Sequence, residues 1–196
     1  MCVKLKTLGV TLDSALTLED HINGVVRSCN FHIRALRHVR PHLTREVVNT
    51  VACRIVGTSI DYCNSLFYGA SEKYFKNRDY HSIDLLRELH WLPIRSLIPF
   101  TVATDCRRAL NDGQPSCLAS KLIRYRPTRL LRSSDRDLLQ EPPCTTKTDA
   151  RRFSCSAPIV WNSIPLTLRD VQTTSAFKTR LQYIYSTAPL PRYSRK

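Results

Sequence analysis

Apolar residues recur at three- and four-residue steps in several stretches of this chain, the spacing that places side chains on one face of an α-helix. The first such stretch starts at Thr17, which can cap a helix, with Glu19 and Asp20 in the first turn, where the helix dipole favours acidic side chains. A helix with a one-sided apolar stripe is therefore predicted from residue 17 to residue 39. The stripe consists of Ile22, Val25, Val26, Cys29, Ile33 and Leu36.

A second helix is predicted after Pro41, which ends the first one. Thr44 can cap this helix, and Glu46 follows in its first turn. The helix is rich in β-branched residues, which have a low intrinsic helix propensity, so it needs burial against another element to be stable. It leads into the sequence DYCNSLFYG, where Gly69 is the predicted stop.

Two further helices are predicted to meet at Trp91, inside the sequence ELHWLPI. Ser82 can cap the first, and the second can begin at Pro93, because a proline loses nothing by lacking an N–H in a first turn. The sequence Asn-Asp-Gly at 111–113 ends the second helix. Trp91 is interpreted as a core residue at this corner. Pro99 is expected to interrupt the second helix, since an interior proline costs roughly 3 kcal/mol.

The C-terminal half has weaker patterns. A short helix is predicted within Pro115–Tyr125, followed by a basic loop with one extended piece near Leu138–Leu139. The apolar side chains of residues 153–165 are expected to pack against another element. A last helix is predicted with Thr174 or Ser175 as its cap.

The N-terminal residues 3–13 alternate imperfectly between apolar and polar, which predicts a short strand or hairpin with Gly9 at a bulge or a close approach. The fold class is therefore mostly α, built from helical hairpins with a short N-terminal β remnant and irregular basic loops. Four segments are predicted: the strand remnant at 1–16, a helical segment at 17–80, a helical segment around the ELHWLPI corner at 81–126, and a basic loop and tail with a last helix at 127–196.

Composition indicates a globular chain with polyanion partners. Of its 196 residues, 42% are hydrophobic and 23% charged, which is not the composition of a disordered protein. The formal net charge of +14 favours nucleic acid as a partner ahead of an acidic membrane surface. No stretch is long and apolar enough to span a membrane, and the start MCVKLKTLGV lacks the apolar core of a signal peptide. An intracellular protein, nuclear or cytoplasmic, is expected, and its oligomeric state is left open.

Arginines are the candidate contacts for such a polyanion. On the first predicted helix they lie largely off the apolar stripe, where they can follow a phosphate backbone or form a solvated basic face. In the later basic loop the excess of arginine over lysine favours phosphate contacts, because the planar guanidinium matches phosphate geometry, although solvation of the loop is the alternative. The candidates are Arg27, Arg34, Arg37 and Arg40 on the helix and Arg124, Arg126, Arg129 and Arg132 around the loop.

No active site, metal site or cofactor site is predicted. The eight cysteines form no CxxC pair, and no histidine pair lies beside a cysteine pair, so the spacings of zinc sites are missing. In a chain that is not secreted the cysteines are interpreted as reduced thiols, several of them acting as small hydrophobic residues on helix faces. Glycine-rich phosphate-binding loops and the common hydrolase motifs are also missing from the sequence.

Several phrases of the sequence together resemble a known family. They are LGVTLDSALTLEDHI, HIRALRHVRPHL, DYCNSLFYG, LRELHWLPI, GQPSCLA, LRSSD, FSCSAPIVWNSIPLTLR and SAFKTRLQ. In this order they resemble the C-terminal part of reverse transcriptases from non-LTR, LINE-type retrotransposons of the jockey-like and chicken-repeat-like clades. The resemblance covers nearly the whole chain. One departure is the short bridge SEKYFKNRDYH at 71–81, where the family usually has a longer helix.

The resemblance implies a nucleic-acid-binding fragment without catalysis. The family's palm, with its paired metal-binding aspartates, would lie upstream of these residues, so two-metal nucleotidyl transfer is not expected here. Residues 1–16 would be the end of the palm, with Leu8 and Gly9 in the segment that supports the primer end, and residues 17–80 would be thumb-like. The implied partners are the missing palm and RNA or DNA, bound through backbone phosphates without sequence readout. The alternative is a host-adopted helical module that binds another protein and has no role with nucleic acid.

Overall fold

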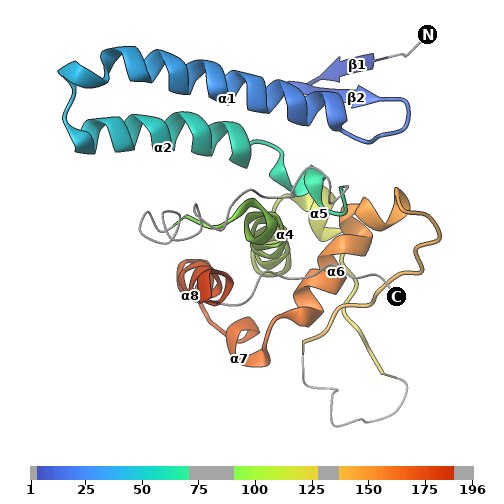
Figure 1. Ribbon diagram of the computed structural model, residues 1–196. Helices are drawn as coiled ribbons and strands as arrows, with labels where there is room; N and C mark the ends of the chain where they lie inside the picture. Colours follow the sequence, from blue (N-terminus) through green and yellow to red (C-terminus); the bar gives the residue numbers. More distant parts are fainter. Residues whose placement is uncertain (1–3, 71–90, 128–136, 188–196) are drawn as a thin grey trace. The chain divides into compact units, whose positions relative to one another are not determined.

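The computed structural model describes residues 4–70, 91–127 and 137–187, which fold into two compact units, Met1–Tyr74 and Phe75–Lys196 (Figure 1). The predicted fold class is confirmed: helices dominate both units, and the described strands form one small N-terminal sheet. The first unit contains the segment predicted at 1–16 and the described part of the segment predicted at 17–80, and it ends at Tyr74. The helix predicted from Ser82 and the bridge at 71–81 lie outside the described residues.

The N-terminal sheet is a β-hairpin of β1 (Lys4–Thr7) and β2 (Val10–Asp13). Its two-residue turn is made by Leu8 and Gly9, with φ values of 45° and 78°, the backbone twist of a type I′ turn. The Tyr62 hydroxyl donates a hydrogen bond to the carbonyl of Leu8, and a Cβ at Gly9 would lie 3.3 Å from the Tyr62 ring. Gly9 is therefore a turn residue at a close approach rather than a bulge.

Two long helices lie side by side after the hairpin, α1 (Glu19–Val39) and α2 (Arg45–Asp61), joined by the 3₁₀ turn η1 (Arg40–His42) (Figure 1). The predicted cap of the second helix is confirmed, because the Thr44 hydroxyl accepts a hydrogen bond from the backbone N–H of Val47 at 3.4 Å. After α2 the chain forms a second 3₁₀ turn, η2 (Asn64–Phe67).

Asp13 organises the start of α1. Its carboxylate accepts hydrogen bonds from the backbone N–H groups of Ala15, Thr17 and Leu18 at 2.9–3.0 Å, and from the Thr17 hydroxyl at 2.9 Å. The prediction that Thr17 caps the helix is therefore wrong by one residue: Leu18 is the N-cap, in the left-handed conformation, and the Thr17 hydroxyl only reaches the N–H of Glu19 at 3.3 Å. The Asp13 carboxylate instead fixes the turn that leads into α1, because its three backbone donors all lie before Glu19.

The described secondary-structure elements of the second unit are helices. The helix α4 contacts α5, α6 and α8, and α7 contacts α8. Within the described ranges no helix is both long and apolar enough to cross a lipid bilayer. The elements are α4 (Ile94–Asn111), α5 (Ser116–Ala119), η4 (Asp149–Arg151), α6 (Phe153–Ser163), α7 (Leu166–Arg169) and α8 (Thr174–Thr187).

Several predicted element boundaries need correction. The helix α4 begins after Pro93 as its N-cap and continues through Pro99. Pro99 cannot donate to the carbonyl of Arg95, but it is buried, and packing of this turn offsets the lost hydrogen bond. The helix expected within Pro115–Tyr125 is a single turn, α5. The cap of the last helix is Thr173, whose hydroxyl accepts from the N–H of Ala176 at 3.2 Å.

The core of the second unit forms where α4, α6 and α8 meet. Trp161 from α6 and Phe177 from α8 are completely buried, with ring centroids 6.0 Å apart. Cys106 from α4 is also buried, and burial raises the pKa of its thiol to about 12, so it stays protonated and packs as a small apolar side chain. Trp91, the expected centre of the corner, is only half-buried.

Polar groups of two α6 side chains, the buried Trp161 and the half-buried Asn162, hold the irregular segment that begins at Asp137. The Trp161 indole donates to the carbonyl of Asp137 at 2.9 Å. The Asn162 amide both accepts from the N–H of Leu139 and donates to its carbonyl, at 2.9 Å each, as a neighbouring strand would. On its other side Leu139 forms an antiparallel bridge with Arg124, which confirms the predicted extended piece. The α6 side chains therefore replace a second strand.

Arg107 performs a similar role in the link between α7 and α8. It is only 6% exposed, and its guanidinium donates to the carbonyls of Arg169 at 2.6 Å, of Val171, and of Gln172 at 3.3 Å. Its Cζ atom also lies 5.6 Å from the centroid of the Phe177 ring. One side chain of α4 therefore binds the backbone that leads into α8 and caps the aromatic core.

Substitution Arg107→Ala should lower the free energy of unfolding by roughly 3 kcal/mol, because it removes hydrogen bonds from a buried charged side chain to backbone carbonyls, and hydrogen bonds of charged groups are worth about 1.5–3 kcal/mol each. Chemical denaturation followed by circular dichroism measures this. The neighbour Arg108 provides the matched control, because it is exposed and makes only a long 3.9 Å ion pair with Asp105. Arg108→Ala should cost less than about 1 kcal/mol. Equal losses for both variants would contradict the role assigned to Arg107.

Asp13 should make stability depend on pH. Its hydrogen bonds, chiefly that from the Thr17 backbone N–H, hold the pKa of its carboxyl below the ordinary 3.8. A lowered folded-state pKa means that the stabilisation is complete above pH 3.8 and is lost as the pH falls through the folded-state value. Asp13→Ala should therefore cost about 1 kcal/mol at neutral pH, with a difference from wild type that shrinks in acid. Unfolding at several pH values measures this, and a difference independent of pH would contradict it.

Candidate nucleic-acid interface

The outward face of α1 carries the first group of predicted contacts. Cys29 is buried against the rest of the unit, and at about 100° per residue Arg27 and Arg34 project roughly opposite to it, within about 20° of each other. Around the helix axis, Arg37 lies about 80° from Arg27. Arg40 lies just after α1, as the first residue of η1. All four arginines are exposed. The structure therefore places the first three on α1, with Arg27 and Arg34 on a common outward line, and the fourth in the turn that follows the helix.

The charge of this face is not neutralised within the unit. Arg27 and Arg34 are seven residues apart, which is roughly 10 Å along the helix axis. In the part of the chain that the structure describes, none of the four arginines forms an ion pair or a side-chain hydrogen bond. Asp20, in the first turn of the helix, is instead paired with Lys4 at 3.1 Å. The guanidinium donors of the outward face are thus available to an external anion.

An aromatic side chain lies between the two outward arginines and was not among the predicted contacts. Phe31 is four residues after Arg27 and three before Arg34, and 68% of its surface is exposed. Its ring meets that of His32 edge-on, with centroids 5.4 Å apart. The sequence feature that could have identified this contact is a phenylalanine that lies off the apolar stripe, with an arginine at helical spacing on each side. An exposed ring between cations is the arrangement on which unpaired bases stack.

The predicted primer-support residues form the tip of the N-terminal hairpin. Leu8 is 84% exposed, and the bond from Tyr62 fixes its carbonyl. The conformation of Gly9 has a positive φ, which a side chain would disfavour. An exposed apolar residue is thus held in a defined turn.

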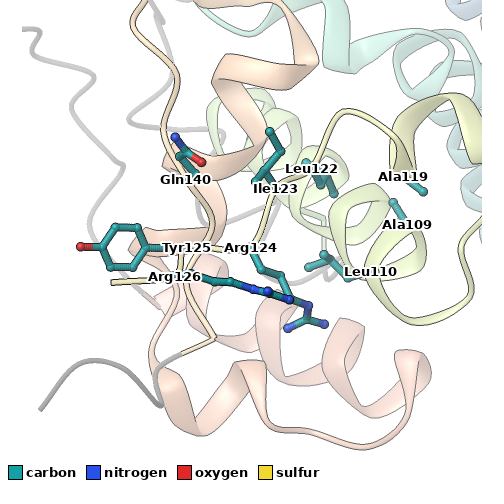
Figure 2. A pocket seen from close by; sticks show the side chains of 9 residues that line it. All are labelled: Ala109, Leu110, Ala119, Leu122, Ile123, Arg124, Tyr125, Arg126 and Gln140. Carbon is teal, nitrogen blue, oxygen red and sulfur yellow. The ribbon is translucent and has the colours of Figure 1, made fainter. Parts of the chain in front are cut away.

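The second group of predicted contacts lies in the second unit. Arg124 and Arg126 line an open pocket of about 700 Å³, whose wall includes Ala109 and Leu110 (Figure 2). In Figure 2 the Tyr125 ring lies away from Ala109, as expected for alternating side chains of an extended segment. The guanidinium of Arg124 forms an ion pair with Asp137, so its charge is already compensated. Arg129 and Arg132 lie outside the described residues.

One group of side chains could hold a metal ion, although the cysteine spacing predicted none. Cys144, Asp149 and Cys155 converge in the second unit. The pKa of the Cys144 thiol is raised to about 11, first by its hydrogen bond with Cys155 and then by burial. The described residues hold no other group of three or more metal-binding side chains. The three residues are five and six positions apart in the sequence, a spacing unlike the paired cysteines and histidines of zinc motifs, and they come from three different local structures.

Comparisons of the chain with family models, with curated proteins and with solved structures found no match.

Proposed function

We propose that this protein binds RNA or DNA through the outward face of α1, by contacts to backbone phosphates that do not read sequence. The observation that carries the proposal is the set of four exposed arginines on α1 and the adjoining turn η1, free of acidic partners in the described residues, in a chain of net charge +14. Arginine suits this task because its fork of donors matches the phosphate oxygens. Such contacts give affinity that falls steeply with salt.

We further propose that the chain is a non-catalytic C-terminal piece of a LINE-type reverse transcriptase. The support is the ordered set of family-like phrases in the sequence. In this proposal α1 and α2 are thumb-like, the hairpin tip at Leu8 and Gly9 supports a primer end, and the absent palm is the natural partner. In this proposal the chain catalyses no reaction itself and only binds template and primer.

The arginine proposal predicts a change in salt dependence. The double variant Arg27→Gln/Arg34→Gln should reduce the slope of log affinity against log salt for a DNA duplex by about 1.8, since each phosphate contact contributes about 0.9. Fluorescence anisotropy at several salt concentrations measures this slope. The variant also isolates the two arginines that project together from α1.

The matched control removes the same charge elsewhere. Lys121 and Arg180 are exposed residues of the second unit, and the variant Lys121→Gln/Arg180→Gln should leave the slope nearly unchanged. If both double variants lose affinity equally, binding follows from net charge alone and the assignment to α1 is wrong.

Phe31 should contribute when the nucleic acid is single-stranded. Stacking of a base on an aromatic side chain is worth about 1–3 kcal/mol, so Phe31→Ala should weaken binding of a single-stranded oligonucleotide roughly 5- to 150-fold, with a much smaller effect on a duplex. Tyr183 of α8, which is 70% exposed, is the matched control, because Tyr183→Ala removes an equally exposed ring from the other unit. An equal effect of Phe31→Ala on single strand and duplex would contradict stacking.

A second candidate function is binding to another protein through α1. It is favoured by Val26 and Ile33, which belong to the predicted apolar stripe but are about half exposed. They lie two turns apart on one flank of the helix, a spacing suited to a partner helix. Substitution of the two apolar residues would weaken binding of the partner protein, and this binding would depend little on salt. That salt dependence distinguishes this function from the one tested by the arginine variants.

A further inference from the structure

Three potential metal ligands of the second unit lie within 4.8 Å of one another: the sulfurs of Cys144 and Cys155 and a carboxylate oxygen of Asp149. They come from different local structures. Cys144 is in the irregular stretch before η4, Asp149 opens η4, and Cys155 is in the first turn of α6. Ligand atoms around a tetrahedral zinc ion are roughly 3.6–3.8 Å apart, so binding would require a contraction of about 1 Å at most.

The backbone around the cluster is held by hydrogen bonds. The N–H of Asp149 donates to the Thr146 hydroxyl at 3.0 Å, and the N–H of Arg152 donates to the carbonyl of Asp149 at 3.0 Å. The N–H of Cys155 in turn donates to the carbonyl of Arg152 at 3.0 Å. Two of the three ligands are therefore placed before any ion arrives, which lowers the entropy cost of binding.

The ligands are shielded from solvent. Cys155 is completely buried, and Cys144 and Asp149 are half-buried. The Cys144 sulfur donates a weak hydrogen bond to the carbonyl of Pro142 at 3.4 Å. Surface carboxylates often gather without an ion, but two shielded sulfurs beside one carboxylate form a different donor set, one that soft and borderline cations prefer.

Arg152 balances the charge of this donor set. Its Nε atom lies 2.7 Å from the Asp149 carboxylate, and one of its terminal nitrogens lies 3.8 Å from the Cys155 sulfur. Two thiolates and a carboxylate carry three negative charges, so a divalent cation leaves one, which the guanidinium neutralises. Hydrogen bonds from such outer groups to the ligands are a regular part of metal sites.

We propose that Cys144, Asp149 and Cys155 form a site for a thiophilic divalent cation of the zinc class, with Arg152 hydrogen-bonded to the ligands and a fourth position left for water. Sulfur ligands exclude magnesium and calcium, which take oxygen donors. The bound ion would join the stretch before η4 to the first turn of α6, the helix that supplies Trp161 to the core. This site is independent of the α1 interface.

The test uses Co²⁺ as a spectroscopic probe on the full chain, reduced with a thiol-free reductant and freed of metal. Tetrahedral thiolate coordination should give intense visible d–d bands and sulfur-to-cobalt charge-transfer bands in the near ultraviolet, and added Zn²⁺ should abolish both. Cys144→Ser and Asp149→Asn should each weaken Co²⁺ binding at least tenfold, as loss of a ligand costs no less than the roughly 10- to 100-fold loss seen for outer groups.

The controls are other cysteines of the same chain. Cys117 is exposed and Cys53 is half-buried in the first unit, and Cys117→Ser and Cys53→Ser should leave the spectrum and affinity unchanged. The proposal is overturned if wild type gives no charge-transfer band, if Cys144→Ser or Asp149→Asn binds as tightly as wild type, or if Cys117→Ser and Cys53→Ser reduce binding equally.

Discussion

Hydrogen bonds from buried side chains to irregular backbone are the constraint on which the second unit depends. A buried backbone group must have a partner, and outside helices and sheets that partner has to be a side chain or water. Arg107 supplies it for the link between α7 and α8, and Trp161 and Asn162 supply it for the segment from Asp137 to Leu139. The same side chains also pack against the core, so packing of the core and hydrogen bonding of the irregular backbone depend on the same residues.

The arginines of this chain therefore serve two different purposes. Arg107 and Arg169 are buried and donate to carbonyls, and Arg124 is paired with Asp137, so their charge contributes to structure. Arg27 and Arg34 have no such partners in the described residues and face outward. The net charge of the chain overstates what a polyanion can contact, and the outward face of α1 presents part of the charge that is accessible.

The proposed interface and the proposed metal site belong to different units and depend on different kinds of interaction. Long-range charge acts at α1, where salt screens it and exposure allows a flexible partner. At Cys144, Asp149 and Cys155 the relevant terms are short-range coordination, shielding from water and an arginine that offsets ligand charge. An ion there would stabilise the stretch before α6, and with it the core around Trp161, without touching the helix that would bind nucleic acid.

The sequence by itself determined the helical class, the N-terminal hairpin, the Thr44 cap and the extended piece at Leu138–Leu139, because periodicity, capping residues and turn glycines act locally. Only the tertiary structure decided that Leu18 rather than Thr17 is the N-cap of α1, that α4 continues through Pro99, and that residues 153–163 form α6. At α1 the hydrogen bonds of Asp13 fix the preceding turn, and at Pro99 burial offsets the lost hydrogen bond. The two sites differ in the same way. The exposed face of α1 can be predicted from helical spacing, whereas the approach of Cys144, Asp149 and Cys155 depends on how the loop before η4 folds back onto α6.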